Sequence, residues 1–177
     1  MIAKLSIFLV LGVFLLSGCV QPAPINVDRS NYTTGALSLT FTDIGIRVSY
    51  PDTWTTEEFL GETRLLPKEE QKDSIPTVFS VSAENWTGSL DDYTTQYLEN
   101  LPLADESSIE TSSTTVAGLP AKQVTFNGND YASGRKFVHT LFVKNGKAYS
   151  VAFGAKEDKF STYSADFQSV LDSLEFV

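Results

Sequence analysis

The sequence predicts a single α+β domain, in which an antiparallel sheet of about six strands is flanked by helices on both faces. Runs of alternating apolar and polar residues between turn residues are typical of strands. Two segments, 89–101 and 159–174, instead carry apolar residues at helical spacing. The strongest hairpin signal joins Lys136–Lys144 to Lys147–Phe153 through Asn145-Gly146, because Asn and Gly tolerate the positive φ of a type I′ turn. Both of these strands are apolar on each face, which favours central positions in the sheet.

The N-terminal half of the domain begins with a predicted hairpin. Alternating apolar residues indicate strands at Leu37–Phe41 and Ile46–Tyr50, and Asp43–Gly45 forms the turn between them. The next predicted elements, in order, are a short strand at Thr63–Leu66, a solvated charged loop at Lys68–Ser74 that holds Glu69 and Glu70, and a strand at Thr77–Ala83.

A helix is predicted to begin after Ser89, whose side chain can accept a hydrogen bond from the first backbone N–H groups. Asp91 and Asp92 suit the positive end of the helix dipole, and Pro102 ends the helix. The predicted elements after it are an edge strand at Ile109–Val116, a turn at Gly118–Pro120, a strand at Ala121–Asn127 and a C-terminal amphipathic helix at Lys159–Leu174.

Composition excludes several classes of function. The chain has 177 residues with 1 Cys and 1 His, so a disulfide framework, a Cys-type zinc site and a His-cluster metal site are excluded. A formal net charge of −9 argues against binding nucleic acid, whose phosphates require a basic surface. We therefore expect no nucleic-acid partner and no cofactor.

The first residues resemble a lipoprotein signal peptide. Lys4 precedes an apolar run that is too short to span a bilayer comfortably. The run ends in Leu16, Ser17, Gly18 and Cys19, which resembles the lipobox of prokaryotic lipoproteins. Small residues before the Cys give the signal peptidase access, and the Cys thiol carries the diacylglyceryl group. Cys19 is thus the expected lipid anchor to the membrane.

These features divide the chain into three parts. Residues 1–18 are the predicted lipoprotein signal peptide, 19–36 a lipid-anchored flexible tether that contains two prolines, and 37–177 a single folded domain. The chain is therefore expected outside the cytoplasm as a membrane-anchored lipoprotein. Asn31 and Asn85 begin glycosylation sequons, which matter only in an archaeal or eukaryotic host.

The order of landmarks along the domain resembles the PsbP-like superfamily, which includes DcrB-type envelope lipoproteins. The segments that carry the resemblance are Tyr50–Trp54, Ser89–Tyr93, Val116–Ala121, the Asn145-Gly146 hairpin and Leu171–Phe176. The resemblance covers residues 37–177 and implies an α/β/α sandwich with an antiparallel sheet. It implies no shared chemistry, because proteins of one fold carry many functions.

Few residues are candidates for chemistry. His139 could be a lone ligand or base, but a hydrogen-bonded position in the sheet is favoured because no second His or Cys completes a site. Asn129, Asp130 and Asp158 supply oxygen ligands for calcium without the EF-hand spacing, so a turn is favoured. Trp86 lies at a strand-to-helix junction, where an exposed ring would suit partner contact, but a ring that closes the end of the sandwich is favoured.

No catalytic residue is assigned. The chain lacks a Gly-x-Ser-x-Gly elbow and phosphate-binding glycine loops, so it is predicted not to be an enzyme. The favoured hypothesis is a lipid-anchored, non-catalytic accessory that binds an envelope protein or assists its assembly. The alternative is a small-molecule or metal-ion binding accessory of envelope transport, and a hydrolase ranks third.

Overall fold

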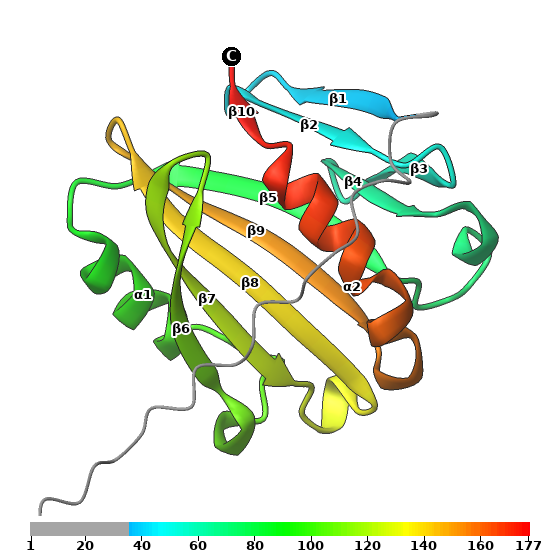
Figure 1. Cartoon of the computed structure of the whole chain (residues 1–177). Helices are drawn as coiled ribbons and strands as arrows, with labels where there is room; N and C mark the ends of the chain where they lie inside the picture. The colour runs from blue at the N-terminus through cyan, green and yellow to red at the C-terminus, as the bar shows by residue number, and fades with distance from the viewer. Residues whose placement is uncertain (1–35) are drawn as a thin grey trace, which may run out of the picture.

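The computed structural model of the chain describes residues 36–177, which form two sheets and two α-helices (Figure 1). The seven strands of the main sheet, in the order in which they lie side by side, are β3 (Trp54–Phe59), β4 (Glu62–Pro67), β5 (Val78–Asn85), β9 (Lys147–Lys156), β8 (Arg135–Lys144), β7 (Leu119–Asn127) and β6 (Glu110–Val116). All neighbouring pairs in this sheet are antiparallel, as the sequence predicts.

A smaller sheet of three strands lies beside the main one. β2 (Ile46–Tyr50) pairs with β1 (Leu37–Phe41) on one side and with β10 (Glu175–Phe176) on the other. The predicted first hairpin is confirmed, but it belongs to this separate sheet. The very short strand β10 was missed, because two residues carry no detectable alternation.

The two α-helices, α1 (Leu90–Glu99) and α2 (Glu157–Asp172), cover opposite faces of the main sheet. Successive side chains of a strand point to opposite faces, so the register separates two apolar clusters. On β9, Tyr149, Val151 and Phe153 face α2, whereas Ala148 packs with the residues around α1. The predicted sandwich of helices around an antiparallel sheet is therefore confirmed.

The α2 face is the better filled of the two. Its cluster contains fully buried Trp54, Phe79 and Phe153, together with residues of α2 and of β2. Phe153 stacks on Phe167 of α2 with ring centroids 4.9 Å apart. Figure 1 shows α2 lying across this face, next to the small sheet.

The α1 face is covered over only part of its area. Tyr93 of α1 packs with Val124 and Phe126 of β7 and with Leu141 of β8. Three short 3₁₀ helices occur in the connections, namely η2 (Lys68–Glu70), η3 (Glu106–Ser108) and η4 (Asp130–Ala132). At the end of this face away from α1, loops border the sheet instead of a helix.

Most predicted elements are confirmed within one to three residues, but strand β3 was missed and two local expectations are wrong. β3 was not predicted, because only Trp54 of its six residues is buried. The turn between β6 and β7 lies at Ala117-Gly118 instead of 118–120. Glu70, expected in solvent, is 6% exposed because its carboxylate binds the backbone of the following loop.

The predicted signal peptide, and the tether up to residue 35, lie outside the described residues. Between residues 36 and 177, neither α-helix has the length and apolar character needed to cross a membrane.

Candidate functional site

A groove lies on the α1 face of the main sheet, next to the first residues of β5 and of β8. Its volume is about 460 Å³. The side chains that line it come from β3, β4, β5, β8, β9 and the loops between them, and they are Phe59, Arg64, Ser74, Ile75, Pro76, Val78, Leu103, Tyr131, Ala132, Ser133, Arg135, Phe137 and Lys156. We call these residues the groove.

The rim of the groove is apolar and exposed. Phe59, Ile75, Leu103 and Tyr131 expose 49%, 57%, 46% and 91% of their surface. They are four of the seven exposed large hydrophobic residues in the described part of the chain. Such side chains are unremarkable when scattered, but their collection around one concavity is typical of a binding surface.

Arg135 fixes the floor of the groove. Its guanidinium is almost buried and donates to the carbonyl oxygens of Ile75 (3.3 Å), Pro76 (3.1 Å) and Gly154 (3.0 Å). Burial lowers the pKa of this guanidinium, and the negative charge of Glu70 partly opposes that shift. Arg135 thus ties the loop that precedes β5 to the first residue of β8.

Two glycines allow this arrangement. A Cβ on Gly154 would lie 2.7 Å from the ring of Phe137. Glycine at this position therefore lets the side chains of Phe137 and Arg135 pack directly against the backbone of β9. A Cβ on Gly128 would lie 2.0 Å from the backbone oxygen of Ala132, which would push η4 and Tyr131 away. The shape of the groove therefore depends on close backbone approach at both positions.

The charged residues that line the groove are all cationic. Arg64 donates to Glu57 at 2.5 and 2.8 Å and lies 3.9 Å from the centroid of the Phe59 ring, which holds that ring at the rim. Lys156 lies 3.8 Å from Asp73. The groove therefore combines apolar side chains with three cationic groups, two of which are paired with carboxylates outside its lining.

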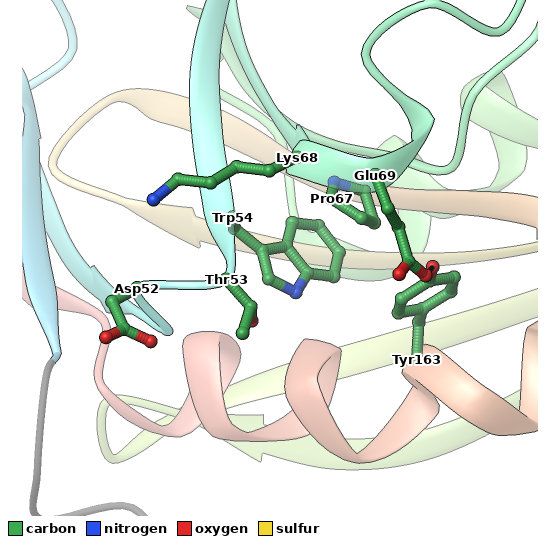
Figure 2. A pocket seen from close by; sticks show the side chains of 7 residues that line it. All are labelled: Asp52, Thr53, Trp54, Pro67, Lys68, Glu69 and Tyr163. Atoms are coloured by element: carbon green, nitrogen blue, oxygen red, sulfur yellow. Dashed lines mark hydrogen bonds between the residues drawn. The ribbon is translucent and has the colours of Figure 1, made fainter.

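A second pocket of about 580 Å³ lies between α2 and the ends of β3 and β4 (Figure 2). The polar atoms of its two aromatic side chains already make hydrogen bonds within the domain. The Trp54 indole N–H donates to Asp166 at 2.8 Å, and the Tyr163 hydroxyl donates to Glu69 at 2.5 Å. Trp54 is 1% exposed, so this pocket offers a ligand little apolar surface.

Glu70 stabilises the loop behind this pocket. Its carboxylate accepts a hydrogen bond from the backbone N–H of Thr77 at 2.6 Å and lies 3.8 Å from Lys159. Burial by itself would raise the pKa of Glu70. The hydrogen bonds from Thr77 and Tyr163 and the charge of Lys159 outweigh that effect and hold the pKa below its ordinary value.

His139 lies under α1 in a polar cluster. Its Nδ1 is 2.7 Å from the Tyr97 hydroxyl, which is 3.0 Å from Oγ of Ser150. Burial lowers the pKa of His139 to about 4, so the imidazole is neutral near pH 7. This arrangement agrees with the favoured expectation of a hydrogen-bonded histidine in the sheet.

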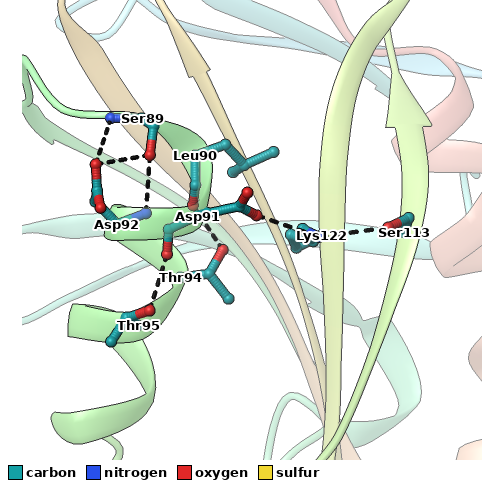
Figure 3. A network of polar contacts seen from close by, with 8 residues as sticks. All are labelled: Ser89, Leu90, Asp91, Asp92, Thr94, Thr95, Ser113 and Lys122. Atoms are coloured by element: carbon teal, nitrogen blue, oxygen red, sulfur yellow. Dashed lines mark hydrogen bonds and ion pairs between the residues drawn. The ribbon is translucent and has the colours of Figure 1, made fainter.

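The start of α1 is fixed by the predicted cap. Ser89 and Asp92 form a reciprocal capping box, and Asp91 lies 3.3 Å from Lys122 of β7 (Figure 3). Lys122 also lies 3.4 Å from Ser113 of β6. The hydrogen bonds of Ser89 hold the pKa of Asp92 below its ordinary value. These acidic residues therefore orient the helix, as expected.

The PsbP-like protein family matches residues 22–176. The chain belongs to the PsbP-like family. No curated protein sequence matches it. The family match begins at residue 22, which lies before residue 37, the predicted start of the folded domain.

Solved structures share the PsbP-like fold. Cyanobacterial PsbP (CyanoP) from Synechocystis sp. PCC 6803 is 14% identical, with a TM-score of 0.59 over 81% of this chain and 93% of that chain. LpqN of Mycobacterium tuberculosis, described as involved in cell envelope biogenesis, is 16% identical, with a TM-score of 0.60 over 80% and 90% of the two chains. At these identities the likeness shows the fold alone.

The lipobox of this PsbP-like chain (Leu16, Ser17, Gly18 and Cys19) lies outside the described residues, so lipidation stays a prediction. Trp86 is half-buried beneath the start of α1. Its indole N–H donates to the Ser89 carbonyl at 3.0 Å, and its ring packs on Tyr93 with centroids 5.3 Å apart. Trp86 is not part of the groove, and its contact with a partner also stays a prediction.

In the turn near η4, the side chain of Asn129 makes hydrogen bonds within the PsbP-like domain. The Asn129 side chain accepts from the backbone N–H of Tyr131 and donates to the Pro102 carbonyl at 2.8 Å. Across residues 36–177, no three His, Cys, Asp or Glu side chains gather as a possible metal site.

The groove was not predicted from the sequence. Its rim residues lie in four separate connections or strand ends, where no periodic pattern marks them. Ile75-Pro76 and Tyr131 are apolar residues inside polar loop segments, and that is the signal that could have drawn attention to them.

Proposed function

We propose that this chain is a non-catalytic, lipid-anchored accessory protein of the cell envelope that binds an envelope protein through the groove. The observation that carries the proposal is the collection of Phe59, Ile75, Leu103 and Tyr131 around one concavity. Exposed aromatic and aliphatic residues around a pocket are typical of binding hot spots.

The location outside the cytoplasm rests on the lipobox. Leu16, Ser17 and Gly18 precede Cys19 after an apolar run, which fits cleavage and lipidation at Cys19. The description of LpqN as involved in cell envelope biogenesis supports the same compartment. A tether between Cys19 and β1 would let the domain reach partners near the membrane.

A non-catalytic role is supported by the family and by the polar groups themselves. Members of the PsbP-like family are generally non-catalytic accessory proteins. The most strongly shifted pKa values among the described side chains are those of Tyr93 and His139 near α1 and of Tyr163 on α2, and none of these three residues lines the groove. Catalytic groups usually lie where a substrate can reach them.

A protein partner fits the rim better than a small ligand does. Tyr131 is 91% exposed and Ile75 is 57% exposed, so both side chains extend beyond the cavity. A small molecule within the groove would leave them in water, whereas a protein surface would cover them.

The groove is tested by photocrosslinking in native membranes. A benzoylphenylalanine in place of Tyr131 is expected to capture one partner, and the same probe in place of Leu37, which is exposed outside the groove, is expected not to. An Ile75→Ala/Leu103→Ala variant should lose the capture, while Leu37→Ala/Val177→Ala should retain it. Capture that survives loss of the rim side chains would contradict the proposal.

The anchor is tested separately by Cys19→Ser. We expect this variant to lose its lipid and to leave the membrane fraction, while a Val20→Ala control stays in it. Quantitative retention of the Cys19→Ser protein in membranes would overturn the anchor without affecting the groove.

The alternative is a small-molecule binding accessory of envelope transport, because a volume of about 460 Å³ lies within the ~300–1,000 Å³ range of ligand sites. A thermal-shift screen with envelope metabolites and divalent ions distinguishes the two. A ligand-dependent shift that Arg135→Met abolishes, with no protein captured at Tyr131, would favour the alternative.

A further inference from the structure

Among residues 36–177, the outermost strand β6 of the main sheet pairs with one neighbour, β7, and no described strand pairs with its other side. Six of its seven side chains are exposed, and the segment reads ETSSTTV. An edge strand presents unpaired N–H and C=O groups that can pair with another strand.

The free edge of β6 is regular. Its register with β7 runs without a bulge from Glu110 opposite Thr125 to Val116 opposite Leu119. The hairpin turn at Ala117-Gly118, with φ of 49° and 76°, has positive φ at both turn residues, as a type I′ turn does. β6 is therefore an unbulged strand that is joined to β7 by a tight turn.

The opposite edge of the same sheet is protected. β3 carries two adjacent glutamates, Glu57 and Glu58, in six residues. Charged residues on an edge strand discourage pairing with another strand. β6 has only Glu110, at its first position, and neither Pro nor Lys interrupts it. The chain thus protects one edge of the sheet and leaves the other open.

We propose that β6 pairs with β6 of a second copy of this chain, antiparallel about a two-fold axis at Ser113. This register places Thr111 opposite Thr115, Ser112 opposite Thr114, and Glu110 opposite Val116. Hydroxyl pairs of this kind are favourable across strands, and no like charges face each other. The result is a continuous sheet of fourteen strands, because the main sheet of each copy contributes seven.

A second copy is favoured over another strand because β6 is complementary to itself. The ammonium group of Lys122 lies 3.4 Å from the Ser113 hydroxyl and is paired with Asp91 of its own copy at 3.3 Å. The centre of the contact therefore contains no unpaired charge. The net charge of −9 on each copy opposes association at long range, so salt should strengthen the dimer.

Disulfide trapping of the full chain in membranes of its own host tests the contact. The chain has 1 Cys, the predicted lipid attachment site, so an added thiol has little background. Ser113→Cys is expected to form a disulfide-linked dimer of this chain under mild oxidation. Thr56→Cys, an exposed position in the middle of edge strand β3, is the matched control and should stay monomeric. No Ser113→Cys dimer, equal dimer from both variants, or a link to a different protein would each overturn the proposal.

Charge variants test the register. Ser112→Lys/Thr114→Lys places lysine opposite lysine in both symmetric pairs and should weaken dimerisation about tenfold. Ser112→Lys/Thr114→Glu changes the same positions but places lysine opposite glutamate, so it should restore the dimer. Sedimentation equilibrium measures both, and circular dichroism checks that each variant folds. Equal dimerisation of the two variants would contradict the register and the proposal with it.

Discussion

The two faces of the main sheet differ in how they are closed. The α2 face buries twenty residues in one cluster, whereas the cluster on the α1 face contains six. The ten-residue helix α1 covers only part of its face, and the rest becomes the groove. This difference suggests that one face supplies most of the stability and the other supplies a surface for binding.

The largest expected effect comes from opening the α2 face. Phe153→Ala removes a fully buried ring that stacks on Phe167 and packs against Phe160. We expect the free energy of unfolding to fall by about 3–5 kcal/mol. Urea denaturation measures the change, and a loss below about 1 kcal/mol would contradict the assignment of stability to this face.

A smaller loss is expected at the floor of the groove. Arg135→Met keeps the apolar length of the side chain but leaves the carbonyls of Ile75, Pro76 and Gly154 without their donor. We expect a loss of about 1–3 kcal/mol. Hydrogen exchange of the backbone N–H groups at 77–79 should accelerate while that of β7 does not. Unchanged exchange would show that Arg135 does not hold the loop.

The α1 face should also respond to pH. The pKa of His139 is lowered from 6.5 to about 4 in the folded chain, so protonation favours the unfolded state. This contribution is fully present above pH 6.5 and is lost as pH falls toward 4. We expect a loss of about 1 kcal/mol between pH 6.5 and 5.5. His139→Gln should reduce this slope, and an identical slope in the variant would contradict the cause.

The smallest effect is expected at the rim. Tyr131→Ala and Ile75→Ala remove exposed side chains, so each should change the free energy of unfolding by less than about 0.5 kcal/mol. Both should nevertheless lose partner capture. Thermal unfolding measures the stability of these variants against that of Phe153→Ala, and photocrosslinking measures their partner capture. A rim variant that unfolds easily would show that the groove is part of the core.

The sequence predicts those elements whose signal is local. β2 alternates buried and exposed side chains, and Asn145-Gly146 adopts the positive φ values of its turn. β3 was missed because its Thr and Glu residues pair with β4 without burying a face. Glu70 was misplaced because its burial depends on Tyr163 and Lys159 of α2, ninety residues later in the chain.

The candidate site was harder to predict than the fold. Cys19 is identified by a contiguous motif, whereas the groove joins Phe59, Ile75, Leu103 and Tyr131 from distant connections. Arg135 stands before a predicted strand with no pattern to distinguish it. Its role appears only when the loop before β5 lies beside β8.

The first strand also has a mechanical consequence. β1 has one partner, β2, and its side chains are exposed or half-buried, with Leu37 opposite Tyr50 at the end nearest the N-terminus. A force that pulls on the chain before Leu37 acts on this end and separates the β1–β2 residue pairs one after another. The five released residues would lengthen the chain by about 17 Å. The seven-stranded sheet does not include β1, so its own strand pairs would stay intact while β1 detaches.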